Sequence, residues 1–187
     1  MTYAAVVVSY NRIDLLEECL AALHRQTLPL DEIIVVDNGS TDGSADLVAV
    51  KYPQVILHRT GTNLGGAGGF AWGGVDIAIA RGHRAAWLMD DDARPEDDAF
   101  APLAEMFERV EPAPSFLASV VTVERGVPNV PNSPSVSTNI RRQFAAQAAG
   151  GIAVTRPDVS GECFAGVSRL VRPVRCERSR VVRPRGA

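Results

Sequence analysis

Four short apolar runs, each ending in polar residues, constrain the fold of this 187-residue chain more than any other feature. They lie at Ala4–Tyr10, Glu32–Asp37, Gln54–Arg59 and Arg84–Met89. Continuous β-branched runs of this length are typical of strands that are buried on both faces of a parallel sheet. Helical patterns separate the runs, and strands that alternate with helices predict βαβ units. We therefore expect an α/β protein with a mostly parallel sheet.

The segments between these runs carry signals of helix starts and ends. Asp14 followed by Glu17 resembles a helix start, and Pro29 ends that segment. Pro95 at the first helical position, followed by the acidic residues Glu96–Asp98, predicts another helix, with Phe100, Leu103, Met106 and Phe107 on one face. The two remaining helices are expected around 45–50 and between a glycine-rich segment and Gly82.

Polar motifs follow all four predicted strands. They are Ser9–Arg12, Asp37–Ser40, the glycine-rich segment Asn63–Gly69, and Asp90–Asp92. In open α/β sheets, ligands bind outside the carboxyl ends of the strands. Because parallel strands present these ends at one edge, we expect the four motifs to converge there and form a ligand site.

Asp90–Asp92 place three consecutive carboxylates at the end of an apolar run. Like charges this close repel one another, so a folded chain keeps them together through solvation or through a bound cation. Hard cations such as Mg²⁺ or Mn²⁺ prefer oxygen ligands and often bind through one or two carboxylates plus substrate phosphates. A solvated acidic turn is the alternative, but the convergence of the other motifs favours a cation site.

The glycine-rich segment has three interpretations. Gly66–Ala71 fits the dinucleotide-binding pattern G-x-G-x-x-A. That pattern directly follows a strand, however, and here several residues separate the glycines from Arg59. The second interpretation is that the glycines let a helix approach the sheet. The third, which we favour, is close approach of the backbone to an anionic ligand.

Several single residues also have both a functional and a structural interpretation. Asp37 can accept hydrogen bonds from a base or a ribose, whereas Asn38–Ser40 favour turn formation, since Asp and Asn bond their own backbone. Tyr10 can stack on a base or belong to the core. His58 and His83 have no partner at metal-ligand spacing, so we expect structural or surface roles for both.

The composition argues against several classes of protein. A net charge of −3 gives no indication of a nucleic-acid partner. The apolar runs are far shorter than the roughly 18–20 residues needed to span a bilayer. The N-terminus lacks the basic start of a signal peptide, so a cytoplasmic location is expected. The widely spaced Cys19, Cys163 and Cys176 predict reduced thiols that bind no metal.

Beyond residue 115 the pattern weakens. The expected elements are strands at Phe116–Val123 and Ala148–Val154, a strand starting at Cys163, and a loop at Asn129–Asn139. Seven arginines fall between Arg169 and Arg185, where no period is sustained. We therefore expect one domain at 1–168, followed by an Arg-rich irregular tail at 169–187.

Four motifs in this order resemble a known family. Val8–Arg12, Val35–Asp42, Asn63–Phe70 and Met89–Asp92 are similar to the nucleotide-sugar half of family 2 glycosyltransferases with the three-layer, Rossmann-like GT-A fold. The glycine-rich segment and the acidic triplet most resemble actinobacterial galactofuranosyltransferases, with rhamnosyltransferases as the near alternative. The resemblance covers about residues 4–125.

The resemblance implies a function and a role for each matched position. The function is transfer of a sugar, galactofuranose first, from a UDP-sugar to a glycan or polyprenyl-linked acceptor of the cell wall. Tyr10 and Asp37 would hold the uracil, with Asn63 beside the nucleotide. Asp90 and Asp92, the outer carboxylates of the D-x-D motif, would reach the ribose and a Mn²⁺ or Mg²⁺ ion that bridges the diphosphate. The full donor-binding set is Ser9, Tyr10, Asn11, Arg12, Asp37, Asn38, Asn63, Gly65, Gly66, Asp90 and Asp91, and the metal ligands are Asp90 and Asp92.

The catalytic base that the resemblance implies is not found at its expected place. Family members use a carboxylate from an acidic motif that follows the last predicted strand. The acids beyond Glu124 are Asp158, Glu162 and Glu177, and none belongs to an acidic pair. We therefore expect a truncated glycosyltransferase with impaired catalysis, whose tail arose by a frame change. A natural basic tail that binds anionic lipid at the inner face of the plasma membrane is the alternative.

Three other interpretations stay open. A non-catalytic nucleotide-binding module would bind UDP without turnover. A rhamnosyltransferase would use a dTDP-sugar. A nucleotidyltransferase should carry a basic glycine-rich loop after the first strand, where this chain has Tyr10–Arg12.

Overall fold

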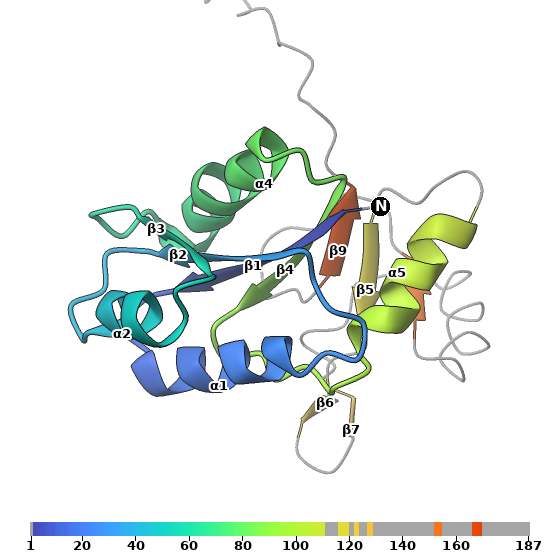
Figure 1. Cartoon of the computed structure of the whole chain (residues 1–187), viewed down its shortest axis with the longest axis horizontal. Coiled ribbons are helices and arrows are strands. Elements are labelled where there is room, and N and C mark those ends of the chain that lie inside the picture. The colour runs from blue at the N-terminus through green and yellow to red at the C-terminus, as the bar shows by residue number, and fades with distance from the viewer. Residues whose placement is uncertain are drawn as a thin grey trace, which may run out of the picture.

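The computed structural model describes residues 2–110, 116–119, 122–123, 127–128, 152–154 and 166–169. Its centre is a seven-stranded sheet with the order β3-β2-β1-β4-β9-β5-β8, beside a two-stranded pair β6-β7 (Figure 1). The strands are β1 (Tyr3–Ser9), β2 (Glu32–Asp37), β3 (Ile56–Arg59), β4 (Ala85–Asp90), β5 (Phe116–Ser119), β6 (Thr122–Val123), β7 (Val127–Pro128), β8 (Ile152–Val154) and β9 (Gly166–Arg169).

The four strands predicted from the apolar runs form the parallel half of the sheet. β1 pairs in parallel with β2 and β4, and β2 pairs in parallel with β3. The α/β prediction is therefore confirmed. The strands from the C-terminal third add a second half, in which β9 lies between β4 and β5 and all pairings are antiparallel.

Helices cover both faces of the sheet. α1 (Ile13–His24), α2 (Ser44–Lys51) and α5 (Phe100–Arg109) pack on one face. α3 (Gly65–Gly68), the π-helical segment η1 (Gly69–Val75) and α4 (Asp76–Ala80) follow one another, and η1 and α4 cover the other face. Figure 1 shows α1 and α4 on opposite sides of the sheet, which gives the three layers expected.

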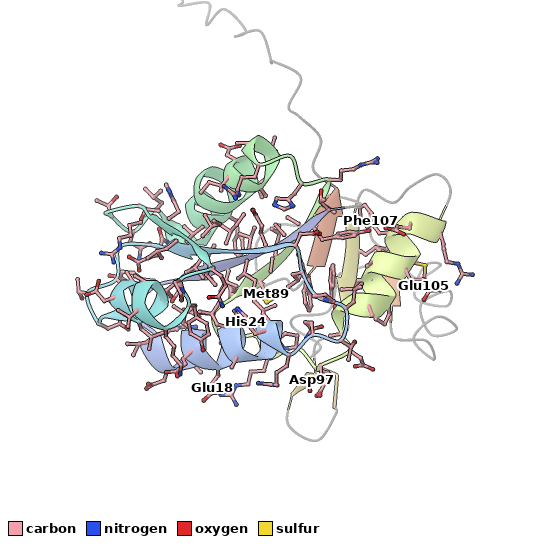
Figure 2. All side chains as sticks on the ribbon, in the orientation of Figure 1. Glu18, His24, Met89, Asp97, Glu105 and Phe107 are labelled. Atoms are coloured by element: carbon pink, nitrogen blue, oxygen red, sulfur yellow. The ribbon has the colours of Figure 1, made fainter. Side chains whose placement is uncertain are left out.

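The core follows the two-residue alternation of the strands. Ala5 and Val7 face α1, while Val6 and Val8 face η1, because successive strand side chains point to opposite faces. The larger cluster lies on the α1 side, where Trp87 stacks on Phe100 with ring centroids 5.3 Å apart. Figure 2 shows Met89 between the sheet and α1, Phe107 on the side of α5 that faces the sheet, and Glu105 on the side of α5 that faces away from it.

The start of α1 differs from the prediction. The helix begins at Ile13, and Asp14 lies inside its first turn rather than capping it. The side chain of Arg12 at the N-cap accepts no backbone hydrogen bond. Instead, Asp42 from the β2–α2 connection accepts a 2.9 Å hydrogen bond from the Ile13 N–H. The cap therefore comes from a segment that is distant in sequence.

The start of α5 also differs, since the helix begins at Phe100 rather than at Pro95. Tertiary hydrogen bonds hold residues 96–98 in a turn. The Gln26 side chain donates to the Glu96 carbonyl at 2.8 Å and accepts from the Phe100 N–H at 2.9 Å. The Thr27 N–H donates to the Asp97 carbonyl at 2.7 Å. The helical face predicted beyond this point is confirmed by buried Phe100, Leu103 and Phe107, with Met106 partly buried.

The glycine-rich segment is helical rather than a loop from Gly65 onward, and the helix continues through η1. The glycines along it fall into two groups, those that lie against the sheet and those that do not. A Cβ atom on Gly74 would lie 2.1 Å from Cγ1 of Val6, and one on Gly69 would lie 2.6 Å from Cγ1 of Val8. These glycines therefore let the helix approach β1. Gly65 and Gly66 have open space where a Cβ would stand, so the sheet does not require them.

The C-terminal predictions are partly covered by the described residues. The strand expected at 116–123 appears as β5 and β6, the one at 148–154 as β8, and the one from Cys163 as β9. The loop expected at 129–139 and the tail after Arg169 lie outside the described residues, and the domain boundary stays a prediction. Within the described part of the chain, no helix has the length and hydropathy that crossing a membrane requires.

Candidate functional site

The predicted motifs meet at the carboxyl edge of the parallel strands. Ser9, Asp37 and Asp90 are the last residues of β1, β2 and β4, and the register pairs Ser9 with Asp37 and Val8 with Asp90. The segment after β3 joins them, since the Thr60 N–H donates to the Asp37 carbonyl at 3.0 Å. The convergence expected from the strand pattern is therefore present.

The three carboxylates of the acidic triplet have three different environments. Asp90 ends β4 and is half-buried, on the sheet face that Ala86 and Leu88 share, by strand alternation. Asp91 is buried, with 3% of its surface exposed, whereas Asp92 is exposed. The triplet is thus neither a fully solvated turn nor a uniform cluster.

Asp91 is held by groups from the end of β1. Its Oδ2 accepts from the Tyr10 N–H at 3.4 Å, and its Oδ1 pairs with the Arg12 guanidinium at 3.3 Å. Burial raises the pKa of Asp91, and the Ser9 hydroxyl and Arg12 partly oppose that rise. Ser9 Oγ is buried and makes no well-aligned hydrogen bond within the described part of the chain.

Arg12 links the two C-terminal carboxylates of the triplet. The same guanidinium nitrogen lies 3.3 Å from Asp91 Oδ1 and 3.3 Å from Asp92 Oδ2. The neighbouring Asp91 carboxylate raises the pKa of Arg12, with a smaller contribution from Asp92. About half of the Arg12 side chain, 52%, is exposed. The predicted donor-binding arginine is therefore an ion-pair partner of the predicted acidic motif.

Asn11 fixes the turn between β1 and α1. Its φ of 52° is positive, a conformation that Asn tolerates better than most residues. Its N–H donates to Ser40 Oγ at 3.0 Å, and its Oδ1 accepts from the Thr41 N–H at 2.7 Å. These bonds tie the β1 and β2 motifs together. Sequence reasoning missed Ser40, Thr41 and Asp42 as partners, because no local pattern records a contact between separate loops.

Asp37 and Asn38 both take part in turn chemistry. Asp37 is buried, and its Oδ1 accepts from the Ser40 N–H at 3.1 Å. Asn38 is buried and donates to Asn63 Oδ1 at 3.1 Å and to the Gly65 carbonyl at 3.2 Å. Its Oδ1 accepts from the Leu64 N–H at 2.9 Å. Asn38 therefore clamps the glycine-rich segment to β2, and its predicted contact with the donor stays a prediction.

The entrance to the glycine-rich segment is open at the site. Asn63 and Gly65 are exposed, and Asn63 Oδ1 accepts from the Gly65 N–H at 2.8 Å. Gly65 has a φ of 70°, which lets the chain turn into the helix. The side chains of Tyr10, in the motif after β1, and of Leu64, in the glycine-rich segment, are also exposed, at 44% and 46%. The exposed Tyr10 ring and the exposed backbone of Gly65 are available to a nucleoside.

The donor atoms of the triplet fit a divalent cation that shares its coordination with a ligand. Asp90 and Asp92 offer carboxylate oxygens at the strand end, although Asp92 Oδ2 also pairs with Arg12. Asp91 is buried and bound to Tyr10 and Arg12. In the described part of the chain, no group of three or more His, Cys, Asp or Glu side chains is arranged to hold a metal alone. Two carboxylates plus phosphate oxygens are a usual set for Mg²⁺.

Two other groups of residues fall outside this site. Cys19 is a free, buried thiol beneath the Asp90 carbonyl, and burial raises its pKa to about 12, which suits the inert role expected. The acids considered as a catalytic base, Asp158, Glu162 and Glu177, lie outside the described residues.

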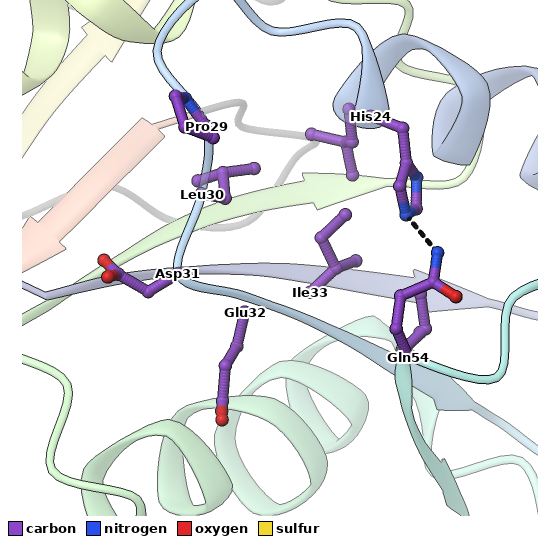
Figure 3. Close-up of a pocket in the computed structure, with 9 residues that line it drawn as sticks. His24, Pro29, Leu30, Asp31, Glu32, Ile33 and Gln54 are labelled. Atoms are coloured by element: carbon purple, nitrogen blue, oxygen red, sulfur yellow. Dashed lines mark hydrogen bonds between the residues drawn. The ribbon is translucent and has the colours of Figure 1, made fainter.

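A separate pocket of about 220 Å³ lies at the opposite, amino end of β2 (Figure 3). Leu23, His24, Glu32 and Gln54 are among its lining residues. The His24 imidazole contacts the Leu20 carbonyl through Nδ1 and the Gln54 amide nitrogen through Nε2, at 2.8 and 2.7 Å. None of the predicted site residues lines this pocket.

Comparison with known proteins identifies relatives of this chain. The family described as Glycosyl transferase family 2 matches residues 4–164. Galactofuranosyltransferase GlfT1 of Mycolicibacterium smegmatis is 42% identical over 93 residues, which cover 50% of this chain and 30% of that protein. The chain thus spans about a third of the length of this curated relative.

Two solved structures share the fold. S. aureus TarS (residues 1–349) superposes with a TM-score of 0.61 at 21% identity, covering 91% of this chain and 47% of TarS. The mannosyltransferase PcManGT from Pyrobaculum calidifontis, solved with GDP-Man and Mn²⁺, has a TM-score of 0.52 at 26% identity. That match covers 66% of this chain and 36% of the mannosyltransferase.

Proposed function

Because this chain belongs to glycosyl transferase family 2, we propose that it binds the nucleotide diphosphate of a UDP-sugar at the carboxyl edge of β1, β2 and β4. In the whole protein, the sugar would pass to a glycan or lipid-linked acceptor. Galactofuranose is the proposed sugar, supported by the similarity to the galactofuranosyltransferase of M. smegmatis. The single observation that carries the proposal is the acidic triplet, which ends β4 beside the exposed ends of the other motifs.

Apart from the buried Asp37, the proposed contacts use groups that the site leaves exposed. Tyr10 would stack on the uracil, and Asn63 with the backbone of Gly65 and Gly66 would border the nucleotide. Asp37 would reach the base with the carboxylate oxygen that Ser40 does not use. Asn38 and Asn11 would hold these segments through their side-chain hydrogen bonds. Ser9 would do so through its carbonyl, which accepts from the Asn38 N–H at 2.8 Å.

Asp90 and Asp92 are the proposed ligands of Mn²⁺ or Mg²⁺. A cation there would stabilise the negative charge that develops on a diphosphate leaving group. The Mn²⁺ in the related mannosyltransferase structure supports this choice of metal. Asp91 would remain with Arg12 and keep the end of β4 in place.

Calorimetry of UDP binding with and without Mn²⁺ tests the proposal. We expect UDP to bind in the presence of Mn²⁺, and Asp92→Asn to weaken that binding by about tenfold or more, because the cation loses a charged ligand. Asp97→Asn is the matched control. Asp97 is an exposed carboxylate on the same β4–α5 connection as Asp92, and it pairs with Arg25, which follows α1. Equal UDP affinity with and without metal would overturn the role of the carboxylates.

A comparison of UDP with dTDP in the same assay addresses the donor. Tighter binding of UDP is expected for a galactofuranosyltransferase, whereas tighter binding of dTDP would favour a rhamnosyltransferase. UDP binding by this chain together with no transfer by the whole protein would indicate a non-catalytic nucleotide-binding module.

A further inference from the structure

The Arg12 guanidinium forms ion pairs with two carboxylates that differ sharply in solvent exposure. Its guanidinium nitrogen lies 3.3 Å from both Asp91 and Asp92. The side chain of Asp91 is 5% exposed and that of Asp92 is 50% exposed. The two halves of this bridge, Arg12–Asp91 and Arg12–Asp92, therefore differ in the free energy needed to break them.

The half that involves Asp91 is costly to break. A buried carboxylate that loses its charged partner keeps an uncompensated charge in a poorly solvated place. The half that involves Asp92 is a half-exposed ion pair, and such pairs contribute little to stability. When another cation approaches Asp92, Arg12 can leave that carboxylate while it stays with Asp91.

The backbone around Arg12 is held by hydrogen bonds, whereas about half of its side chain is exposed. Arg12 is the N-cap residue of α1, and its carbonyl accepts from the Leu16 N–H at 3.0 Å. On either side, Asn11 is bonded to Ser40 and Thr41, and the Ile13 N–H is bonded to Asp42. These contacts keep the guanidinium within reach of the triplet.

We propose that Arg12 is a positioning residue that competes with the divalent cation for Asp92. The inference rests on the proposed function, in which Asp90 and Asp92 hold the cation. Arg12 keeps Asp92 compensated and oriented through the same Oδ2 that a cation can use, and it yields this oxygen to the cation while remaining paired with Asp91. Arg12 thereby sets how readily the site takes up metal without nucleotide.

Titration of the chain with Mn²⁺ alone, followed by calorimetry and by electron paramagnetic resonance of free Mn²⁺, tests this competition. We expect Arg12→Gln to tighten Mn²⁺ binding by roughly three- to tenfold, since removal of an exposed pair and of a nearby positive charge favours the competing cation. Arg12→Lys keeps the charge but not the planar fork, so an intermediate affinity is expected. It also preserves a partner for Asp91 if Arg12→Gln folds poorly.

Arg94→Gln is the matched control. Arg94 follows Asp92 by two residues and pairs with Glu18, so the variant removes the same charge without touching the triplet. We expect its Mn²⁺ affinity to stay within about twofold of the unmodified chain, because exposed charges interact weakly through water. Equal tightening in Arg94→Gln and Arg12→Gln would overturn the inference, because it would show a general charge effect.

Two other outcomes separate this inference from the proposed function. Unchanged Mn²⁺ affinity in Arg12→Gln, together with metal-dependent UDP binding by the unmodified chain, would overturn the competition alone. Absence of Mn²⁺ binding from every variant, with or without UDP, would overturn both the competition and the metal role of the triplet.

Discussion

At the scale of single residues, the pKa values of two carboxylates at opposite ends of the sheet are shifted in opposite directions. Burial raises the pKa of Asp91 at the carboxyl edge. At the amino edge, the Arg81 guanidinium, with a contribution from His83, lowers the pKa of Glu32 to about 2. The difference follows from the partners: Glu32 meets two strong hydrogen-bond donors and keeps 27% of its side chain exposed, whereas Asp91 is enclosed. The first arrangement stabilises the fold, and the second keeps an acidic strand end in place.

Glu32 gives a prediction for pH dependence. A folded-state pKa below the ordinary value of 4.5 means that its contribution is present above that pH and is lost as the pH falls toward 2. We expect Glu32→Gln to lower the free energy of unfolding by about 1 kcal/mol at neutral pH, after solvent screening, and by less near pH 2. Urea unfolding at several pH values measures this.

Glu105→Gln is the control for Glu32. Glu105 forms an exposed i,i+4 pair with Arg109 on α5, and we expect its loss to change stability by less than about 0.5 kcal/mol. A loss for Glu32→Gln that is the same at pH 2 and pH 7 would contradict the assignment.

At the scale of elements, η1 is a helix two of whose glycines are explained directly by its packing against the sheet. Helix η1 lies against β1 because Gly69 and Gly74 present no side chain to Val8 and Val6. Both valines belong to β1, which lies between β2 and β4, and both are buried, so they have little room to move. The close approach carries the glycine-rich entrance, with Gly65 and Gly66, toward the end of β1.

Substitution of these glycines separates packing from exposure. We expect Gly74→Ala to lower the free energy of unfolding by about 1–3 kcal/mol, because the added methyl group overpacks the contact with Val6. Gly66→Ala should be neutral or stabilising by up to about 1 kcal/mol, because Ala suits a helix and the space is open. Equal effects of the two variants in denaturant unfolding would exclude close packing as the reason for Gly74.

At the scale of the whole molecule, the proposed ligand site joins segments that are far apart in the chain. Asn38 connects β2 to the glycine-rich segment, Asn11 connects β1 to the loop after β2, and Arg12 connects α1 to the end of β4. A ligand that contacts all of them stabilises the folded chain rather than one element.

This arrangement predicts cooperation between metal and nucleotide. We expect UDP and Mn²⁺ together to raise the melting temperature more than the sum of their separate effects. At a ligand concentration one hundred times the dissociation constant, the stabilisation is about 2.7 kcal/mol. Differential scanning fluorimetry with EDTA as the reversal measures it, and additive shifts would contradict a shared site.

The sequence by itself determined the parallel half of the sheet and the edge at which the polar motifs gather. β-branched runs and their polar ends are local patterns, and parallel strands align their carboxyl ends whatever the partners are. The buried face of α5 was also local, since Phe100, Leu103 and Phe107 repeat at helical spacing. The individual roles assigned to the site residues stay predictions.

Only the tertiary structure decided where α1 and α5 begin and how the acidic triplet is divided. Asp42 and Gln26 supply hydrogen bonds across long sequence separations, and these override the local start signals at Asp14 and Pro95. Likewise, nothing in three consecutive aspartates distinguishes them. Asp91 is buried and bound to Tyr10 and Arg12 because the end of β1 lies beside the end of β4, and that neighbour exists only in the folded chain.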